Sequence, residues 1–274
     1  MKQRIITAVI FAAAMLGGVF GGERSFYFIF TIIAIGCAWE LMGILIVEEK
    51  FKTLRRVWGT VAGILPFWLV AAGFIFILPI WVTTFIASLM VFGMFAAMAV
   101  ELFLGSERPF ANVGNYLLCV LYIGLPFAML ANIAIEFDMP YKPLRVFGLL
   151  LLIWTNDTMA YFVGSQLGRR KLFERISPKK TWEGTIGGGI CTVLVAWGLS
   201  FLIKDFTTIQ WLALGAVAAV FGTLGDLVES MLKRSVGVKD SGNLLPGHGG
   251  LLDRFDAFIF ALPFFWLALQ IFKG

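Results

Sequence analysis

Charged residues are scarce in this sequence. Lys, Arg, Asp and Glu make up 14% of the 274 residues, whereas 59% are hydrophobic and the mean hydropathy is +0.89. Soluble domains contain roughly one quarter charged residues, so this composition excludes a soluble globular domain. Windows of about 20 apolar residues, the length that an α-helix needs to cross a bilayer, follow one another along almost the whole chain. The sequence therefore predicts an integral membrane protein with many spans.

Cysteine is also scarce, and each of the three cysteines falls in a different apolar stretch. Cys37, Cys119 and Cys191 are therefore expected to be packing residues rather than disulfide partners or metal ligands. The chain shows no low-complexity tract, no obvious internal repeat and no linker long enough to separate soluble domains. Lys2 and Arg4 precede an apolar run, but the following GGVFGGERS offers no A-x-A cleavage site. We therefore expect a retained first helix rather than a signal peptide.

The apolar windows predict an all-α polytopic bundle of about nine transmembrane helices, with eight as the alternative. The expected spans are roughly 5–21, 26–47, 57–78, 80–104, 113–135, 145–167, 185–203, 209–232 and 252–272. Residues 1–140 are expected to form about five helices that serve as a scaffold and a lipid groove. Residues 141–274 are expected to form about four helices with cytoplasmic loops at 168–184 and 233–251. Most ionisable residues inside spans belong to this second part, so a functional site is expected there.

The Lys and Arg residues predict an orientation, because cytoplasmic loops of membrane proteins carry an excess of both. With nine spans, five of the 22 Lys and Arg residues lie on one side, namely Arg24, Lys142, Arg145, Lys204 and Lys273. The other seventeen lie on the side of the N-terminus. This bias places the N-terminus in the cytoplasm and the C-terminus outside, in a cell inner membrane. The net charge of +5 then describes the cytoplasmic face, which would attract anionic headgroups and phosphorylated metabolites.

Carboxylates recur at helical spacing in the last two expected spans. Asp226 and Glu229 are three residues apart, as are Asp253 and Asp256, so each pair shares a helix face. A carboxylate deep in a span costs about 2.5–3.5 kcal/mol on insertion scales, which makes several without partners improbable. Such clusters suit a hard divalent cation, and Mg²⁺ takes one or two carboxylates while leaving positions for water and phosphate. The alternative is that these acids pair with neighbouring basic residues at the membrane surface.

Depth estimates bring further polar residues toward the same region. At 1.5 Å per residue, Asp157 lies about 15 Å and Asp226 about 9 Å from the cytoplasmic ends of their spans. Asn156 precedes Asp157 in mid-membrane, where the pair acts either on a substrate or as an interhelical hydrogen-bond pair. Gly164 and Gly168 follow in a small-xxx-small pattern that lets helices approach closely. The carboxylates can therefore line one cavity open to the cytosol.

Two loops supply the complementary positive charge. Residues 230–256, SMLKRSVGVKDSGNLLPGHGGLLDRFD, hold four Lys or Arg, three Asp, five Gly and the only histidine of the chain. A glycine-rich loop broken by Pro246 cannot be helical, and it can bring backbone N–H groups close to an anion. His248 can titrate near neutrality, which leaves open both acid–base work and a hydrogen-bonding role. In the loop 168–184, Ser177 and Pro178 suggest a helix start, and the neighbouring lysines either contact phosphate or only set the topology.

These segments together closely resemble the phosphatidate cytidylyltransferase family, also called CDP-diacylglycerol synthases. The resemblance covers residues 154 to 256: the Lys-Arg pair, Lys-Asp, PGHGG and DRFD appear in order and spacing, and NDTMAYFVGSQLGRR, SPKKTWEG and GDLVES also match. It implies transfer of a cytidylyl group from CTP to phosphatidic acid, giving CDP-diacylglycerol and pyrophosphate. Mg²⁺ is the implied cofactor, with K⁺ as an optional second ion.

The resemblance also implies roles for individual residues. The expected metal ligands are Asp226, Asp253 and Asp256, which with Lys233 and His248 form the expected catalytic set. The expected substrate-binding residues are Asn156, Asp157, Lys179, Lys180, Arg234, Lys239, Asp240, Gly249, Gly250 and Arg254. Two other functions stay open: a cation- or proton-coupled transporter, and a related lipid or polyprenol kinase. The expected partners are the two substrates and membrane lipids, with no nucleic acid, and the Gly-rich spans permit a homodimer.

Overall fold

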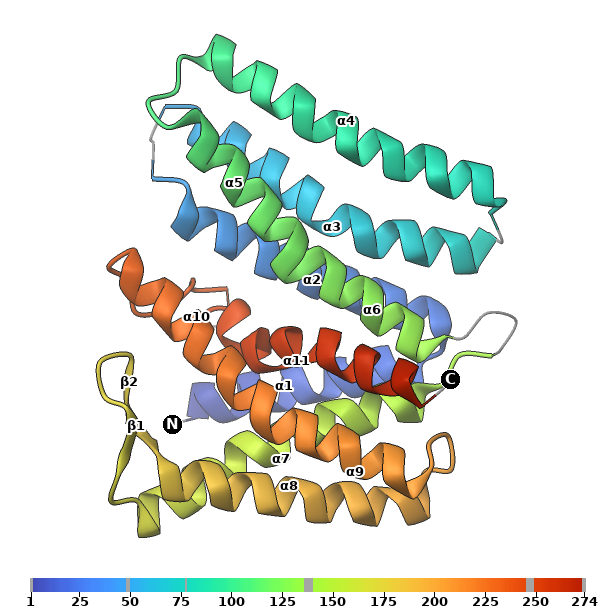
Figure 1. Cartoon of the computed structure of the whole chain (residues 1–274), viewed down its shortest axis with the longest axis vertical. Coiled ribbons are helices and arrows are strands. Elements are labelled where there is room, and N and C mark those ends of the chain that lie inside the picture. Colours follow the sequence, from blue (N-terminus) through green and yellow to red (C-terminus); the bar gives the residue numbers. More distant parts are fainter. Residues whose placement is uncertain (1, 48–49, 77, 136–139, 245–248, 273–274) are drawn as a thin grey trace. The chain divides into compact units, whose positions relative to one another are not determined.

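The computed structural model describes residues 2–47, 50–76, 78–135, 140–244 and 249–272. The chain divides into two compact units. Figure 1 shows its helices and strands coloured along the sequence. Unit 1 comprises Met1–Met139 together with Asp240–Leu252, and unit 2 comprises Pro140–Lys239 together with Asp253–Gly274. The glycine-rich loop was expected with the C-terminal part of the chain. Its segment Asp240–Leu252 instead groups with the N-terminal helices.

Unit 1 is built from helices around an aromatic core. Its elements are α1 (Lys2–Phe20), α2 (Glu23–Leu45), α3 (Lys52–Phe76), α4 (Ile80–Leu104), α5 (Pro109–Cys119), the π-helical turn η1 (Val120–Gly124) and α6 (Leu125–Ala134). The fully buried rings of Phe30 and Phe67 both lie 6.1 Å from the ring of Phe127, measured between centroids. These rings come from α2, α3 and α6, so their packing holds three helices of the unit together.

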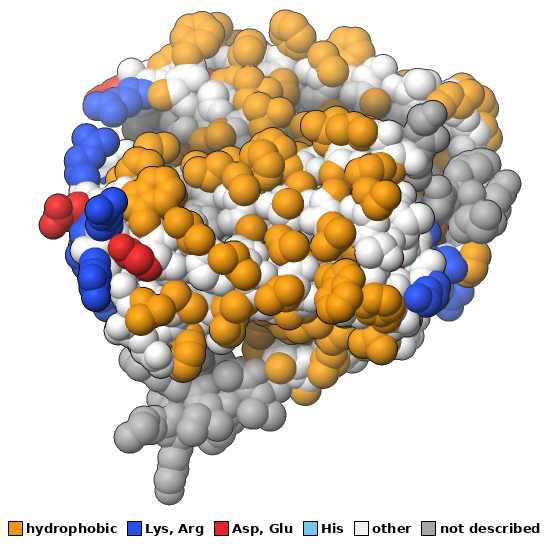
Figure 2. Space-filling view, turned by 60° about the horizontal axis from the view of Figure 1, so that its bottom comes forward, with side chains coloured by type: hydrophobic (Ala, Val, Ile, Leu, Met, Phe, Trp, Pro, Cys, Tyr) orange, Lys and Arg blue, Asp and Glu red, His pale blue; other side chains and the backbone are white. Residues whose placement is uncertain are grey.

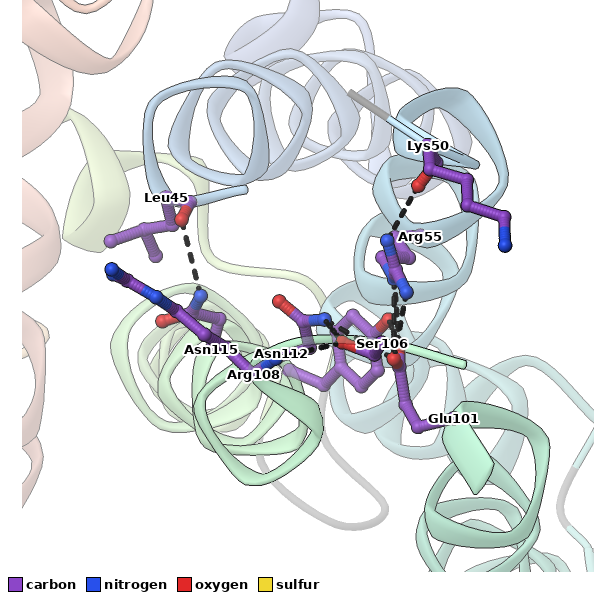
Figure 3. Close-up of polar contacts among 9 residues, drawn as sticks. Leu45, Lys50, Arg55, Glu101, Ser106, Arg108, Asn112 and Asn115 are labelled. Carbon is purple, nitrogen blue, oxygen red and sulfur yellow. Dashed lines mark hydrogen bonds and ion pairs between the residues drawn. The ribbon is translucent and has the colours of Figure 1, made fainter. Parts of the chain in front are cut away.

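A buried ionic network joins α3, α4 and α5 (Figure 3). The Arg55 guanidinium donates to both carboxylate oxygens of Glu101, over 2.9 and 3.0 Å, and the two side chains are only 1% and 2% exposed. Asn112 Nδ2 and the Tyr116 hydroxyl also donate to this carboxylate, over 3.2 and 2.9 Å. Arg55 further donates to the backbone carbonyl of Lys50, over 2.5 Å. Each charge is thus buried together with its partners, which is the condition under which a buried ion pair is tolerated.

Unit 2 carries the remaining helices and one hairpin. Its elements are α7 (Pro143–Leu167), β1 (Lys171–Phe173), β2 (Ser177–Thr181), α8 (Trp182–Leu202), α9 (Thr208–Val217), the π-helical turn η2 (Ala218–Gly222), α10 (Thr223–Ser235) and α11 (Leu252–Ile271), whose first residue groups with unit 1. Gly164 of α7 and Gly184 of α8 meet so closely that a Cβ added to Gly184 would lie 2.9 Å from the Gly164 Cα. The close approach expected of the small residues in α7 is confirmed.

The segment before α8 forms a strand where the sequence predicted the start of a helix. Ser177 and Pro178 were expected to begin a helix, but they belong to β2, which pairs antiparallel with β1. The helix begins four residues later, where the Thr181 hydroxyl accepts a hydrogen bond from the Gly184 N–H over 3.2 Å. Proline fits the first turn of a helix and an edge strand alike, because neither position needs its missing N–H. The N-cap of Thr181 therefore decides where the helix starts.

The expected all-α polytopic architecture is confirmed. Eight helices in the described part of the chain are long and apolar enough to span a membrane, and α1 adds a shorter apolar stretch at Ile10–Phe20. Large apolar side chains such as Trp81, Phe103 and Leu202 are 69%, 86% and 79% exposed, which water would disfavour but lipid accepts. Figure 2 shows a face whose middle is covered by hydrophobic side chains, with Lys and Arg at two opposite edges. The chain is a multi-pass membrane protein.

Candidate active site

Unit 2 contains a cavity of about 480 Å³ at the hairpin, between α7, α8 and α10. This volume lies within the range of small-molecule sites. Five residues expected from the sequence line it, namely Asn156, Asp157, Lys179, Lys180 and Asp226. They come from three separate segments of the chain. The fold of unit 2 therefore gathers these expected site residues around one space.

An ion pair connects the hairpin to α10 at the edge of this cavity. The Lys180 ammonium on β2 pairs with the Asp226 carboxylate, and their side chains are 25% and 35% exposed. Partial exposure means that both groups remain accessible to a molecule entering the cavity. A pair of this kind can exchange partners, because a phosphate would compete for the lysine and a cation for the aspartate.

A buried amide faces the same cavity from α7. Asn156 is 1% exposed, and its Nδ2 donates to the Thr223 hydroxyl of α10 over 3.2 Å. The Thr223 hydroxyl in turn donates to the Ala219 carbonyl over 2.9 Å. The Oδ1 atom of Asn156 has no hydrogen-bond partner among the residues that the structure describes. A buried acceptor left open beside a cavity is a position for a ligand or water to satisfy.

Acidic groups gather around Asp256 on α11. This carboxylate is 5% exposed, and it interacts electrostatically with Asp226, Glu229 and Asp157. Its Oδ1 atom accepts a hydrogen bond from the backbone N–H of Ala257, over 2.8 Å. Like charges in a poorly solvated place repel one another unless a cation or protons compensate them. Asp256 therefore interacts with other acids, whereas each carboxylate of an ordinary buried ion pair has a cation beside it.

Lys233, one turn after Glu229 on α10, pairs with two acids. Its ammonium donates to Asp253 Oδ1 over 2.6 Å and also pairs with Glu229, which is fully buried. Asp253 thus pairs with a basic neighbour in this structure, which was the alternative to binding a cation. Lys233 was expected in the catalytic set, and here it holds the first turn of α11 to α10. Its ammonium is largely buried between the two carboxylates.

The acids fit Mg²⁺ only as a partial ligand set. Within the described ranges, no group of three His, Cys, Asp or Glu side chains is arranged to hold a metal ion. Mg²⁺ commonly takes one or two carboxylates and completes its shell with water and substrate phosphates. Asp226 and Asp256 interact with each other and supply carboxylate oxygens, the donors that this ion prefers. The residues present therefore fit Mg²⁺ bound together with a phosphorylated substrate.

Other expected residues are not among those that line the cavity. Arg234 is exposed, and its Nη1 donates to the Val238 carbonyl over 3.0 Å in the turn that follows α10. Lys239 and Arg254 are exposed as well. Three further expected residues, Asp240, Gly249 and Gly250, belong to unit 1. The predicted role of His248 concerns a position outside the described residues.

The cavity also includes polar residues that the sequence prediction missed. These are Tyr161, Ser165, Lys171, Ser177, Thr181, Thr185 and Thr223. Every second position of β2 carries one of the three lining residues Ser177, Lys179 and Thr181. A strand prediction would therefore have placed the three on one face. Thr223 lies three residues before Asp226 on α10 and shares its helix face. The missed hairpin thus explains three of the seven missed residues, namely Lys171, Ser177 and Thr181.

The chain is similar to known proteins over nearly its whole length. The family described as the cytidylyltransferase family matches residues 2–272. A phosphatidate cytidylyltransferase of Bacillus subtilis (strain 168) is 36% identical over 281 residues, covering 100% of this chain and 99% of that protein. The phosphatidate cytidylyltransferase of Staphylococcus aureus (strain COL) is 34% identical over 265 residues, covering 96% of each chain. That of Staphylococcus saprophyticus is 43% identical over 156 residues, covering 56% of this chain and 58% of the relative.

Proposed function

This chain belongs to the cytidylyltransferase family, and we propose that it transfers CMP from CTP to phosphatidic acid, giving CDP-diacylglycerol and pyrophosphate. The single observation in the structure that carries this proposal is the cavity of unit 2, which combines lysines with carboxylates. A nucleotide needs cations around its phosphates, and Lys171, Lys179 and Lys180 supply them. The hydroxyls of Ser177 and Thr185 add hydrogen-bond partners for phosphate or sugar.

The reaction joins two polyanions, which decides what the protein must supply. A phosphate oxygen of phosphatidic acid attacks the α-phosphorus of CTP, a new P–O bond forms, and the bond to pyrophosphate breaks. This oxygen is already ionised at neutral pH, so no strong general base is required. Charge repulsion is the main obstacle, and positioned cations are its physical remedy.

We assign the lysines of β2 to the phosphates of CTP. When a triphosphate enters, Lys180 exchanges its ion pair with Asp226 for a phosphate oxygen. Lys179, exposed at the cavity, contributes a second positive charge. The open Oδ1 of Asn156 accepts a hydrogen bond from the bound substrate or its water shell. Together these groups orient the α-phosphate toward the incoming lipid.

We propose Mg²⁺ as the cofactor, held by Asp226 and Asp256, with K⁺ as an optional second ion. When bound, Mg²⁺ supplies charge neutralisation for the phosphates and the leaving pyrophosphate. Asp157 interacts electrostatically with the same cluster and supports it from α7. Lys233 keeps Asp253 and the start of α11 in place. In this assignment Asp253 orients the site rather than serving as a direct ligand.

Membrane insertion brings the lipid substrate to the enzyme. We propose that the cavity faces the cytoplasm in a bacterial inner membrane, with the N-terminus inside and the C-terminus outside. CTP is then supplied from the cytosol, and phosphatidic acid comes from the adjacent leaflet. A cysteine replacing the exposed Arg175, in a background without the three native cysteines, tests this orientation. An impermeant thiol reagent should label it only from the cytoplasmic side, and labelling from outside would invert the proposal.

Labelled CTP separates the proposed activity from a kinase. The purified protein, with Mg²⁺ and phosphatidic acid, should carry label from α-³²P CTP into lipid and release label from γ-³²P CTP as pyrophosphate. Lipid labelled from the γ position would indicate a kinase instead. No lipid labelling with any divalent cation would remove the proposed function. A reaction without phosphatidic acid serves as the control, and chelation of Mg²⁺ should stop transfer.

A further inference from the structure

The most unusual buried charge outside the cavity is Glu40 on α2. Its side chain is 2% exposed, and its Oε2 atom accepts two hydrogen bonds from the glycine-rich loop. The Ser241 hydroxyl donates over 2.9 Å, and the Leu252 backbone N–H donates over 2.9 Å. These partners lie 201 and 212 residues from Glu40 in the sequence, and all three residues belong to unit 1. One carboxylate thus joins both ends of the loop 241–252.

The hydrogen bond to Leu252 has a specific place in the helix that follows. Leu252 is the first residue of α11, so its N–H is one of those that have no partner within the helix. A carboxylate at a helix N-terminus satisfies such a donor and interacts favourably with the helix dipole. Asp253 is the next residue in the chain, and Asp256 follows one turn later. Glu40 therefore fixes the point from which the helix bearing these two acids begins.

Two glycines of the loop fit closely against this carboxylate. A Cβ added to Gly250 would lie 1.9 Å from the Ser241 hydroxyl and 2.5 Å from Glu40 Oε2. A Cβ added to Gly242 would lie 2.4 Å from Glu40 Oε1. No larger residue fits at either position without moving the loop. Gly250, expected to bind substrate, is thus needed here for its contact with Glu40.

The charge of Glu40 is compensated from α3. Arg56 interacts electrostatically with Glu40, stacks 3.9 Å from the centre of the Trp39 ring and donates to the Trp39 carbonyl over 2.8 Å. The nearby guanidinium and the two hydrogen bonds from the loop are the polar partners of this buried carboxylate. Glu40 is therefore built to hold its two loop partners tightly.

We propose that Glu40 is a positioning residue for the cytidylyl transfer, because it closes the base of the loop 241–252 and sets the start of α11. The inference rests on the proposed function in one respect, namely that this loop and α11 serve the reaction. Glu40 touches neither substrate nor metal in this role. It acts through Ser241 and Leu252, and the segment between them includes His248.

Backbone hydrogen exchange tests the contact without using activity. In Glu40→Ala, amides of the segment 240–252 should exchange at least about tenfold faster than in the wild type, because both hydrogen bonds are lost. Glu40→Gln keeps an oxygen acceptor and should restore most of the protection. The matched control is Glu101→Gln, since Glu101 is also a buried, hydrogen-bonded glutamate of unit 1. This control should change exchange in α3, α4 and α5 but leave the loop as it is.

Steady-state kinetics tests the positioning role. The sequence predicts that the loop contacts phosphate, so Glu40→Ala should raise the KM for CTP about tenfold, while the KM for phosphatidic acid changes less. A loss of folded protein alone would lower the apparent kcat and leave both KM values unchanged. If Glu40→Ala does not fold, Ser241→Ala removes only a hydroxyl and should move exchange and KM in the same direction by about threefold.

The outcomes separate the two proposals. Unchanged exchange of the segment 240–252 in the Glu40 variants would overturn the contact, and faster exchange with unchanged KM values would overturn the positioning role. The double variant Glu40→Ala with Ser241→Ala should change exchange and KM no more than Glu40→Ala does. The reason is that Glu40→Ala already removes the hydrogen bond between these two residues. If the wild type makes no lipid-linked cytidylate, the proposed function fails. The exchange experiment then still decides whether Glu40 holds the loop.

Discussion

Buried carboxylates occur in both units, but their partners differ. Glu101 in unit 1 accepts hydrogen bonds from Arg55, Asn112 and Tyr116, so its charge is satisfied on all sides (Figure 3). Asp256 in unit 2 interacts instead with further acids, Asp226 among them. Both environments are poor in water, yet only the first compensates the charge that it buries.

The difference indicates which buried charges serve the fold and which serve the reaction. A satisfied ion pair stabilises its unit and offers nothing to a substrate. Acids held close to one another lower the stability of their unit, and they gain compensation when a cation binds. The partners of a buried charge are therefore a better guide to function than its burial. The following changes test this distinction.

The largest effect is expected from the acids of unit 2. Asp256→Asn should lower the rate of cytidylyl transfer at least about 1,000-fold, because it replaces the carboxylate of an expected metal ligand by an uncharged amide of similar shape. Its melting temperature in detergent should stay unchanged or rise, since one of several repelling charges is gone. Labelled CTP and a thermal melt measure the two quantities. Near-normal turnover would remove Asp256 from the site, and a large drop in stability would contradict the proposed repulsion.

The opposite pattern is expected in unit 1. Arg55→Met leaves the Glu101 carboxylate buried without its guanidinium, which costs about 3–5 kcal/mol of stability for a broken buried pair. The protein that stays folded should keep the wild-type KM for CTP. Combining Arg55→Met with Glu101→Leu should recover most of the stability, because neither charge of this pair then remains buried. Unfolding in a graded detergent series measures both variants, and a stable single variant would show that this pair contributes little.

The positions of the helices follow from hydropathy, whereas the partners of the charges do not. Every expected span overlaps an observed helix, because an apolar window of this length has few alternatives in a bilayer. The π-helical turns at Val120–Gly124 and Ala218–Gly222 were not expected, since a local change of hydrogen bonding leaves the apolar pattern intact. The hairpin was missed because Pro178 suits a helix start as well as an edge strand.

The sequence predicted part of the lining of the candidate site but not the pairing of its charges. Asn156, Asp157, Lys179, Lys180 and Asp226 were expected from the sequence and line one cavity. The pairing of Lys233 with Asp253 and Glu229 depends on how two helices approach each other, which spacing along one helix cannot show. The contact of Glu40 with Ser241 joins residues 201 positions apart, and a single sequence contains no signal for such a distance.

A smaller effect is expected from the ion pair at the cavity. Lys180→Met should raise the KM for CTP about 10- to 100-fold, since one charge-assisted contact to phosphate is lost. Unit 2 offers a matched control, because Lys142 pairs with Asp205 over 3.2 Å and lies outside the cavity lining. Lys142→Met should leave both KM and kcat unchanged. Equal effects of the two variants would mean that Lys180 acts only through surface charge.

The smallest effect is expected from the hydroxyl that holds Asn156. Thr223→Val keeps the shape of the side chain but leaves Asn156 Nδ2 without this acceptor, so the amide loses its fixed direction at the cavity. One neutral hydrogen bond is worth about 0.5–1.5 kcal/mol, which corresponds to a roughly two- to thirteenfold loss of kcat/KM for CTP. Thr192→Val is the control, because Thr192 is buried in the same unit and bonds only to the Gly188 carbonyl of its own helix among the contacts found in the described residues. An equal loss in both variants would assign Thr223 to packing. A loss confined to Thr223→Val would show that the open oxygen of Asn156 faces the substrate.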